Sequence, residues 1–426
     1  MQTYIVLIAC VILLLCLFFR VPVYISVFAA ALTYFLFQTG SSPAIIAQRI
    51  GGGIQSIPLL AIPFFICAGI FMNSSGVTKR IMNFCNVVTK RMTGGLGQVN
   101  VLLSTLMGGL SGSNLADAAM EAKILVPEME EKGYSKEFSS VLTATSAMIT
   151  PLIPPGIGMI LYGSIANVSI GKLFVAGIGI GVLLCISLMI MVHFISKKRG
   201  YQPATKEKQD PEEVKSAVKQ AILPLCLPIL IIGGIRIGIV TPTEAGTVAI
   251  VYALILGIIY KELKMSDVVD GLKESVATTA SIMMIVGGAS AFAWVLTKER
   301  IPQQLTEVIT SSISNKYVFL IIVILFLLVV GMFIEGNAAM IVLVPLLAPA
   351  YGINEIHFAM LFIFVMAVGG VTPPMGTLIF VTCGVTKCDI KAFIKESMPF
   401  YIMLLILMLG IAFIPALSTG LVNLVY

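Results

Sequence analysis

Uncharged apolar runs, each long enough to cross a lipid bilayer, recur along the whole chain. The clearest cover residues 1–19, 21–48, 50–78, 92–116, 173–196, 275–297, 317–334 and 397–426. Roughly 20 apolar helical residues span the ~30 Å hydrocarbon core of a bilayer. Backbone groups in lipid must form their hydrogen bonds within their own segment, which favours helices for runs of this length. The sequence therefore predicts an all-α polytopic membrane protein.

The composition excludes an ordinary water-soluble domain. Of the 426 residues, 58% are hydrophobic and only 11% are charged, whereas soluble domains carry about 25% charged residues. Shorter or interrupted apolar runs lie at 138–171, 220–235, 245–260, 336–354 and 358–386. With the first set they predict about ten to fourteen membrane elements. The first run has no basic start and no small-residue cleavage site, so we interpret it as a retained membrane helix.

Basic residues cluster at the ends of these runs. The formal net charge is +6, and its placement beside apolar segments indicates membrane topology and no nucleic-acid partner. Residues 197–219 form the longest hydrophilic stretch and begin with Lys197, Lys198 and Arg199. Because basic loops stay on the cytoplasmic side of a membrane, we expect this loop to be cytoplasmic.

Other functional classes find little support in the sequence. The eight cysteines form no CxxC pair, and His193 and His357 lie far apart, so we expect no cofactor and no resident metal. The chain has no GxxxxGK[ST] loop for an ATP-driven pump, and no Ser/His or paired Asp arrangement for an intramembrane enzyme. A channel or a passive scaffold subunit stays open as an alternative, because broken helices also occur in channels.

Glycine and proline interrupt the apolar runs at four places. The interruptions are GGLSGSN at 108–114, TPLIPPGIG at 150–158, GMFIEGN at 331–337 and GGVTPPMG at 369–376. Non-helical backbone at membrane depth is tolerated only where it is buried in protein or faces a cavity. Paired broken segments are typical of the binding site of a secondary transporter.

The interruptions belong to a predicted internal duplication. Residues 118–127 (AAMEAKILVP) match residues 338–345 (AAMIVLVP). A proline of the following loop, Pro155 or Pro373, lies 28 residues after the last proline of each segment. Substrate and ion sites of duplicated transporters lie where the repeats meet. The relative orientation of the two repeats stays open.

Five motifs in this order resemble the large membrane subunit of tripartite ATP-independent periplasmic (TRAP) transporters. They are GGLSGSNLADAA (108–119), TPLIPPGIGMILYG (150–163), TPTEAG (241–246), GMFIEGNAA (331–339) and GGVTPPMG (369–376). The similarity covers nearly the whole chain. The resemblance implies an elevator-type ion transporter fold in the inner membrane of a bacterial cell. It also implies two repeats, each with a re-entrant helical hairpin and a broken helix.

The resemblance further implies a function and partners. TRAP transporters import carboxylate-bearing solutes with a sodium gradient and without ATP, so sodium ions are the expected coupling ions. A soluble periplasmic substrate-binding protein delivers the organic anion, and a small four-helix membrane subunit packs beside the large one. We favour a sialic acid, N-acetylneuraminate, as the solute. A C4-dicarboxylate or another organic acid is the alternative.

The motifs and the apolar runs divide the chain into six predicted parts. They are N-terminal scaffold helices with an interfacial arm (1–92), a first transport repeat (93–196), the loop 197–219, scaffold helices with the start of the second repeat (220–316), a second transport repeat (317–396) and a C-terminal membrane helix (397–426). Each transport repeat contains two of the four interruptions.

Small oxygen-bearing residues beside the interruptions are the candidate sodium ligands. Sodium binds oxygen atoms, often hydroxyls and the carbonyls of unwound backbone. The expected sodium ligands are Ser111, Asn114, Thr150, Gly336, Asn337, Thr372 and Thr377. The alternative is that these small residues only permit close helix packing.

A substrate carboxylate needs hydrogen-bond donors, which helix N-termini provide together with a partial positive charge. The expected substrate-binding residues are Ser111, Ser113, Gly156, Glu335 and Gly376. The carboxylate of Glu335 either bonds substrate hydroxyls or balances the charge of sodium. The resembling family often has Ser where this chain has Gly156 and Asp where it has Glu335, so only a backbone N–H is expected at Gly156. Lys298 and Arg300 end an apolar run and either attract the anion or mark a helix end.

Three more acidic residues lie near the motifs, and each leaves two interpretations. Asp117 and Glu121 are four residues apart, on one helix face, where they either tune the site or face water. Glu244 of the TPTEAG motif either serves the site or pairs with Arg236 in the scaffold. Ionisable residues inside apolar runs are costly and usually functional, which is why they are singled out.

Overall fold

The computed structural model describes residues 2–19, 21–38, 43–203, 210–301, 303–304, 307, 315–347 and 351–426. Every regular element within these residues is a helix, which confirms the predicted all-α membrane fold. Six of the described helices are long and apolar enough to cross a bilayer. A seventh span results if the bent pair Ile390–Glu396 and Met398–Phe413, at 55° to each other, counts as one. Shorter apolar helices accompany them.

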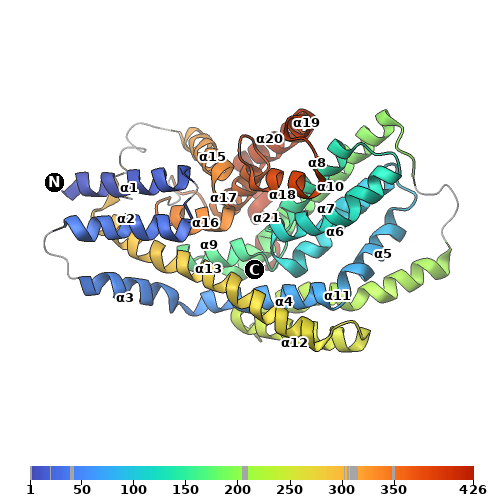
Figure 1. The fold of residues 1–426 in the computed structure, drawn as a ribbon, viewed down its shortest axis with the longest axis horizontal. Helices are drawn as coiled ribbons and strands as arrows, with labels where there is room; N and C mark the ends of the chain where they lie inside the picture. The colour runs from blue at the N-terminus through green and yellow to red at the C-terminus, as the bar shows by residue number, and fades with distance from the viewer. Residues whose placement is uncertain are drawn as a thin grey trace.

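One group of helices follows one side and one end of the molecule (Figure 1). Its members are α1 (Gln2–Phe18), α2 (Val23–Phe37), α3 (Pro43–Ile54), η1 (Ile57–Leu60), α4 (Ala61–Ser74), α5 (Val77–Thr89), α11 (Pro211–Ile237), α12 (Pro242–Tyr260) and α13 (Met265–Lys298). The long helix α13 packs against α2, α3 and α4, and α4 packs against α12. Large apolar side chains such as Ile229 and Ile258 point outward, 70% and 72% exposed. Outward apolar side chains are expected of helices surrounded by lipid.

The second group comes from two separate parts of the chain. The first part contains α6 (Gly95–Ser111), α7 (Asn114–Glu131), α8 (Lys136–Ser146), η2 (Ala147–Ile149), α9 (Ile157–Ala166) and α10 (Ile170–Arg199). The second part contains α15 (Lys316–Phe333), α16 (Gly336–Leu343), α17 (Glu355–Gly370), α18 (Thr377–Thr386), α19 (Ile390–Glu396), α20 (Met398–Phe413) and α21 (Ala416–Val425). Helix α7 packs against α18, and α9 packs against α16, so helices of the first part pack directly on helices of the second part.

The two parts share an order of elements but differ in length. In each part a helix ends at a short break and a second helix begins directly after it. A third helix follows, and a proline-rich loop then leads into a fourth helix. The helix after the first break, α7, has 18 residues and contains Pro127. Its counterpart α16 has 8 residues and ends before Pro345. The common order supports the duplication, which stays a prediction.

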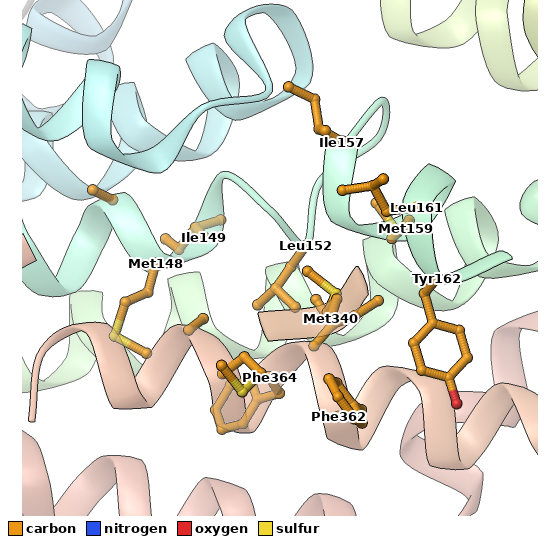
Figure 2. Packing of buried hydrophobic residues seen from close by; sticks show 14 of the residues in the cluster. Met148, Ile149, Leu152, Ile157, Met159, Leu161, Tyr162, Met340, Phe362 and Phe364 are labelled. Atoms are coloured by element: carbon orange, nitrogen blue, oxygen red, sulfur yellow. The ribbon is translucent and has the colours of Figure 1, made fainter. Parts of the chain in front are cut away.

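An apolar layer holds the loop between η2 and α9 in the interior (Figure 2). Leu152 of this loop is fully buried, and Figure 2 shows it beside Met340 of α16, above Phe364 of α17. Tyr162 of α9 meets Phe362 edge to face, with ring centroids 5.6 Å apart. Between helices in a bilayer, close packing stabilises such contacts, because lipid tails are as apolar as the side chains. The layer therefore fixes the loop that leads into α9.

The hydrophilic stretch 197–219 includes the ends of two helices. Helix α10 ends at Arg199, and α11 begins at Pro211. The side chain of Asp210 caps α11 by accepting a hydrogen bond from the backbone N–H of Glu212 (3.1 Å). Arg199 pairs with Glu396 of α19 at 2.7 Å. Residues 211–219, the last part of the hydrophilic stretch, form about the first two turns of α11.

Candidate functional site

The first break separates α6 from α7 and is built by three residues. Ser111 ends α6, and Gly112 adopts a left-handed conformation with φ +66°. Glycine tolerates this conformation without a steric penalty, so it stops the helix here. Ser113 then caps α7, its hydroxyl accepting from the backbone N–H of Ala116 (3.4 Å). Asn114 is consequently the first residue of α7.

The second break separates α15 from α16 and carries an acidic cap. Glu335 precedes α16, and its carboxylate accepts a hydrogen bond from the backbone N–H of Ala338 (3.0 Å). Gly336 and Asn337 follow as the first residues of α16. A carboxylate at this position already offsets the partial positive charge of the helix N-terminus.

The two proline-rich loops end in helices that begin directly after a glycine. Gly156 precedes α9 and Gly376 precedes α18, and neither helix has a side-chain cap or an acidic residue in its first turn. A Cβ atom at Gly156 would lie 2.5 Å from the carbonyl oxygen of Pro151. A Cβ atom at Gly376 would lie 2.5 Å from the carbonyl oxygen of Gly370. Both positions therefore require glycine for a close approach of backbone to backbone. The Pro154–Pro155 and Pro373–Pro374 bonds are cis.

A small cavity of about 20 Å³ lies where the breaks and loops meet. Its walls are Gly112, Asn114, Pro151, Glu335, Gly336, Asn337, Met340, Ile363, Met366, Ala367, Gly370 and Thr377. Four expected sodium ligands from both parts of the chain, and one expected substrate ligand, thus share one cavity. Its volume is that of about one water-sized guest.

The other predicted residues do not line this cavity. They are Ser111, Ser113, Thr150, Gly156, Thr372 and Gly376. Thr372 lies just after α17, and its hydroxyl donates to the carbonyl of Val368 in the last turn of that helix (2.7 Å). Gly156 and Gly376 lie one residue before the first turns of their helices, so the N–H groups that follow them form the N-termini of α9 and α18.

Asp117 connects two of those residues. The hydroxyls of Ser111 and Thr150 both donate to Oδ2 of Asp117, at 2.5 and 2.7 Å. The Asp117 side chain is only 1% exposed, and its Oδ1 atom has no hydrogen-bond partner. Glu121, one turn later, is fully buried and accepts from Ser104 (2.6 Å). The alternative that these two acidic residues face water is therefore wrong.

The predicted pair of Glu244 with Arg236 does not form. The carboxylate of Glu244 accepts hydrogen bonds from both the N–H (2.7 Å) and the hydroxyl (2.8 Å) of Thr241. It thereby completes a capping box at the start of α12. Arg236 instead donates to the carbonyl of Val425 (3.1 Å). Lys298 is the last residue of α13, as expected of a helix end.

Sequence reasoning missed several residues of the cavity wall. Met340, Ile363 and Met366 are apolar residues inside helices, and no local signal separates them from core residues. Gly112 and Pro151 lie inside the GGLSGSN and TPLIPPGIG interruptions, so the motif positions could have identified them.

Known proteins resemble this chain along most of its length. The family described as the DctM component of the tripartite ATP-independent periplasmic transporter matches residues 10–417. The sialic acid TRAP transporter large permease protein SiaM of Vibrio cholerae is 39% identical, over 94% of each chain. The C4-dicarboxylate TRAP transporter large permease protein DctM of Pseudomonas aeruginosa is 34% identical, over 93% of each chain.

A solved structure shares the fold at low sequence identity. The YdaH transporter of Alcanivorax borkumensis superposes with a TM-score of 0.61 at 14% identity, over 98% of each chain. This likeness concerns the fold alone. The family match and the two relatives carry the assignment, and they agree with the motifs at the breaks and loops. The chain belongs to the family of large, multi-pass permease subunits (DctM components) of TRAP transporters, which are transporters and not enzymes.

Proposed function

We propose that this chain is the translocating subunit of a sodium-coupled importer for a carboxylate-bearing solute. The observation that carries the proposal is the convergence of three helix starts on one cavity. Asn114 of α7, Gly336 of α16 and Thr377 of α18 all line it, and they come from both parts of the chain. Broken helices whose ends meet inside the membrane are the typical binding site of a secondary transporter.

Charge divides the four helix starts into two kinds. The helices after the breaks, α7 and α16, have an acidic residue in or beside the first turn, Asp117 or Glu335. These two places suit a cation, because hydroxyl, carbonyl and carboxylate oxygens surround them. The helices after the loops, α9 and α18, begin without a cap or an acidic residue. Their free N–H groups and partial positive charge suit a carboxylate.

This division favours one of the two expected roles of Glu335. The sequence places Glu335 with the substrate-binding residues and leaves charge balance for sodium as the alternative. Its carboxylate caps α16, and Glu335 lines the cavity beside Asn337. We therefore place Glu335 beside the sodium ligands, where its negative charge attracts the cation. Gly156 and Gly376 keep the predicted role of presenting backbone N–H groups to the substrate, as parts of an elevator-type moving unit.

Electrostatics favours a sodium-coupled scheme. A singly charged anion that enters a cell with a negative interior works against about 2.3 kcal/mol per 100 mV. Two sodium ions moving with one such anion give a net positive load, so the membrane potential then drives uptake. Two acidic helix starts match two cations.

The relatives support the solute class and the partners. We propose N-acetylneuraminate as the solute, because a sialic acid permease is 39% identical. The C4-dicarboxylate permease, at 34% identity, keeps that solute as the alternative. A periplasmic substrate-binding protein and a small four-helix membrane subunit complete the transporter, in the inner membrane of a bacterial cell with the 197–219 loop in the cytoplasm.

Uptake into vesicles tests the proposal. The chain is reconstituted with its small subunit, and a loaded binding protein supplies radiolabelled N-acetylneuraminate or succinate from outside. Accumulation should need an inward sodium gradient and should rise when the vesicle interior is made negative. Accumulation that continues when potassium replaces sodium would reject the coupling.

Matched variants connect that uptake to the cavity. Thr377→Ala and Asn337→Ala remove side-chain oxygens from its wall and should raise the sodium concentration for half-maximal uptake. Thr247→Ala removes an exposed hydroxyl on scaffold helix α12 and should leave uptake unchanged. Normal sodium dependence in both cavity variants would remove the cavity from the proposed sodium site.

A further inference from the structure

A second, larger cavity of about 640 Å³ lies between the two groups of helices. One wall belongs to α3, η1 and α13, and the other belongs to α9 and α16. Its polar wall residues are Gln48, Arg49, Ser56, Ser164, Ser290 and Thr297. None of the described residues that line it is acidic. Sites for small molecules commonly have volumes of about 300–1,000 Å³.

One cation and one aromatic ring mark one side of this cavity. The guanidinium of Arg49 lies 5.5 Å from the ring centre of Trp294. Lys298 also lies near this ring, at 5.0 Å, but it does not line the cavity and donates to Gln38. Phe35 stacks on Trp294, with centroids 5.6 Å apart and planes 13° apart, so the indole is held in place. Arg49 and the ring can therefore act on one bound molecule.

Arg49 has no ion-pair partner among the described residues, unlike Arg80 and Arg199. Arg80 pairs with Glu262 at 2.9 Å and Arg199 pairs with Glu396 at 2.7 Å. A guanidinium binds a carboxylate through two parallel hydrogen bonds, which a lysine does not reproduce. The free fork of Arg49 is therefore suited to a carboxylate.

The opposite wall offers an unused hydroxyl. The Oγ atom of Ser164, on α9, is buried and has no hydrogen-bond partner. Buried hydroxyls usually form a hydrogen bond, because leaving one without a partner costs free energy. Ser164 and Arg49 thus present polar groups from opposite walls, and Trp294 belongs to the same wall as Arg49.

Helix α16 lies between the two cavities. Its first residues, Gly336 and Asn337, line the small cavity. Ile341, and Pro345 just after the helix, line the large one. A Cβ atom at Gly158 of α9 would come within 2.7 Å of Met340, which shows how closely α9 and α16 pack along this boundary.

We propose that the large cavity is a second binding site for the carboxylate-bearing solute. Arg49 binds the carboxylate, Ser164 bonds a hydroxyl or amide of the solute, and Trp294 covers an apolar face of it. The site holds the solute on the scaffold side of α16, next to the small cavity. The solute class rests on the proposed function, whereas the existence of the site rests on the cavity itself.

The chain offers a direct probe of this site, because Trp294 is its only tryptophan. The full chain is placed in phosphatidylcholine nanodiscs and titrated with N-acetylneuraminate and with succinate while tryptophan emission is recorded. Trp294→Phe supplies the background signal. A saturable emission change in the wild type is expected for at least one of these acids. Arg49→Ala should raise the acid concentration that gives half of the emission change about 10-fold or more. Arg49→Lys should lower it again only in part.

Two control pairs separate binding from general damage. Arg91→Ala removes an exposed arginine outside the cavity and should leave the titration unchanged. Gly52 lines the cavity and Gly51 does not, yet a Cβ atom would meet nothing within 4 Å at either position. Gly52→Leu should therefore fill the cavity and abolish the emission change, whereas Gly51→Leu should not. Equal behaviour of the two leucine variants would overturn the proposal.

Further outcomes distinguish this proposal from the proposed function. Asn337→Ala should impair sodium-driven uptake but keep the emission titration, because it changes only the small cavity. If the wild type transports an acid while emission never responds, and Arg49→Ala transports normally, the second site is refuted alone. If no acid is transported yet emission titrates, the proposed function fails alone. Emission that responds to added phosphatidylglycerol and to neither acid would assign the cavity to a lipid headgroup and refute the proposal.

Discussion

Replacing Asp117 by asparagine should reduce both the stability of the first break and the affinity for sodium. Asp117 collects the hydroxyls of Ser111 and Thr150 on a single carboxylate oxygen, at 2.5 and 2.7 Å. Both hydroxyls belong to expected sodium ligands, and the second carboxylate oxygen has no partner. Asparagine keeps the size of the side chain and can still accept a hydrogen bond, so the substitution mainly removes the negative charge.

The two hydrogen bonds set the size of the effect on stability. A hydrogen bond to a charged group contributes about 1.5–3 kcal/mol, and one between neutral groups contributes about 0.5–1.5 kcal/mol. Replacing two hydrogen bonds to a charged group by two neutral ones therefore lowers the free energy of unfolding by about 2 kcal/mol. A cation about 4 Å from the carboxylate would lose up to ~4 kcal/mol of attraction at an effective dielectric constant of about 20. Since the amide dipole replaces part of this, we expect sodium affinity to fall about 30-fold or more.

Thermal unfolding in nanodiscs measures both effects. Sodium that binds the folded protein raises the wild-type melting temperature by mass action, and potassium at equal ionic strength serves as the reference. Asp117→Asn should melt lower in potassium and should need about 30-fold more sodium for the same rise. Glu131→Gln removes an exposed carboxylate at the far end of α7 and should match the wild type. The same sodium dependence in Asp117→Asn and wild type would refute a cation beside this carboxylate.

Three further substitutions test other parts of the structure. Gly376→Ala brings a Cβ atom to 2.5 Å from the carbonyl oxygen of Gly370, and should destabilise the fold by about 1–3 kcal/mol, measured by thermal unfolding. Asn100→Ala removes a fully buried amide that bonds two hydroxyls at 2.7 Å each, and should cost about 2 kcal/mol in the same assay. Glu335→Gln keeps an acceptor for the α16 cap and loses the charge, so sodium half-saturation of uptake should rise about 10-fold while the folded fraction stays equal. An unchanged half-saturation would contradict the assignment of Glu335 to the cation.

The positions of the breaks and loops were predictable because glycine and proline act locally. GGLSGSN places the end of α6 and the start of α7 within the correct seven residues. The apolar runs likewise predicted helices, since nothing else spans lipid at that length. The family followed from motif order. Each of these inferences depends on residues that are close together in the sequence.

Contacts between distant residues could not be predicted in this way. The spacing of Asp117 and Glu121 fixes a shared helix face, but burial of that face depends on α6 and on the loop that begins at Thr150. The Arg49–Trp294 contact joins helices 245 positions apart in the chain, counted as 294 − 49. No local sequence pattern predicts this contact. The Glu244–Arg236 interpretation was wrong because the carboxylate of Glu244 accepts its hydrogen bonds from Thr241, three residues earlier in the chain.

The role of Glu335 shows why helix starts must be known to the residue. The GMFIEGN motif alone does not fix whether Glu335 lies inside α16 or caps it, because sequence patterns do not place a helix end to a single residue. At the cap, the carboxylate of Glu335 turns back onto the N–H of Ala338. A helix start with a capping carboxylate already holds a negative charge, whereas a start with no cap and no acidic residue in its first turn attracts an anion. Gly156 and Gly376, which bear no side chain, leave the starts of α9 and α18 uncapped, so the proposed separation of sodium from solute depends on which residue occupies each cap.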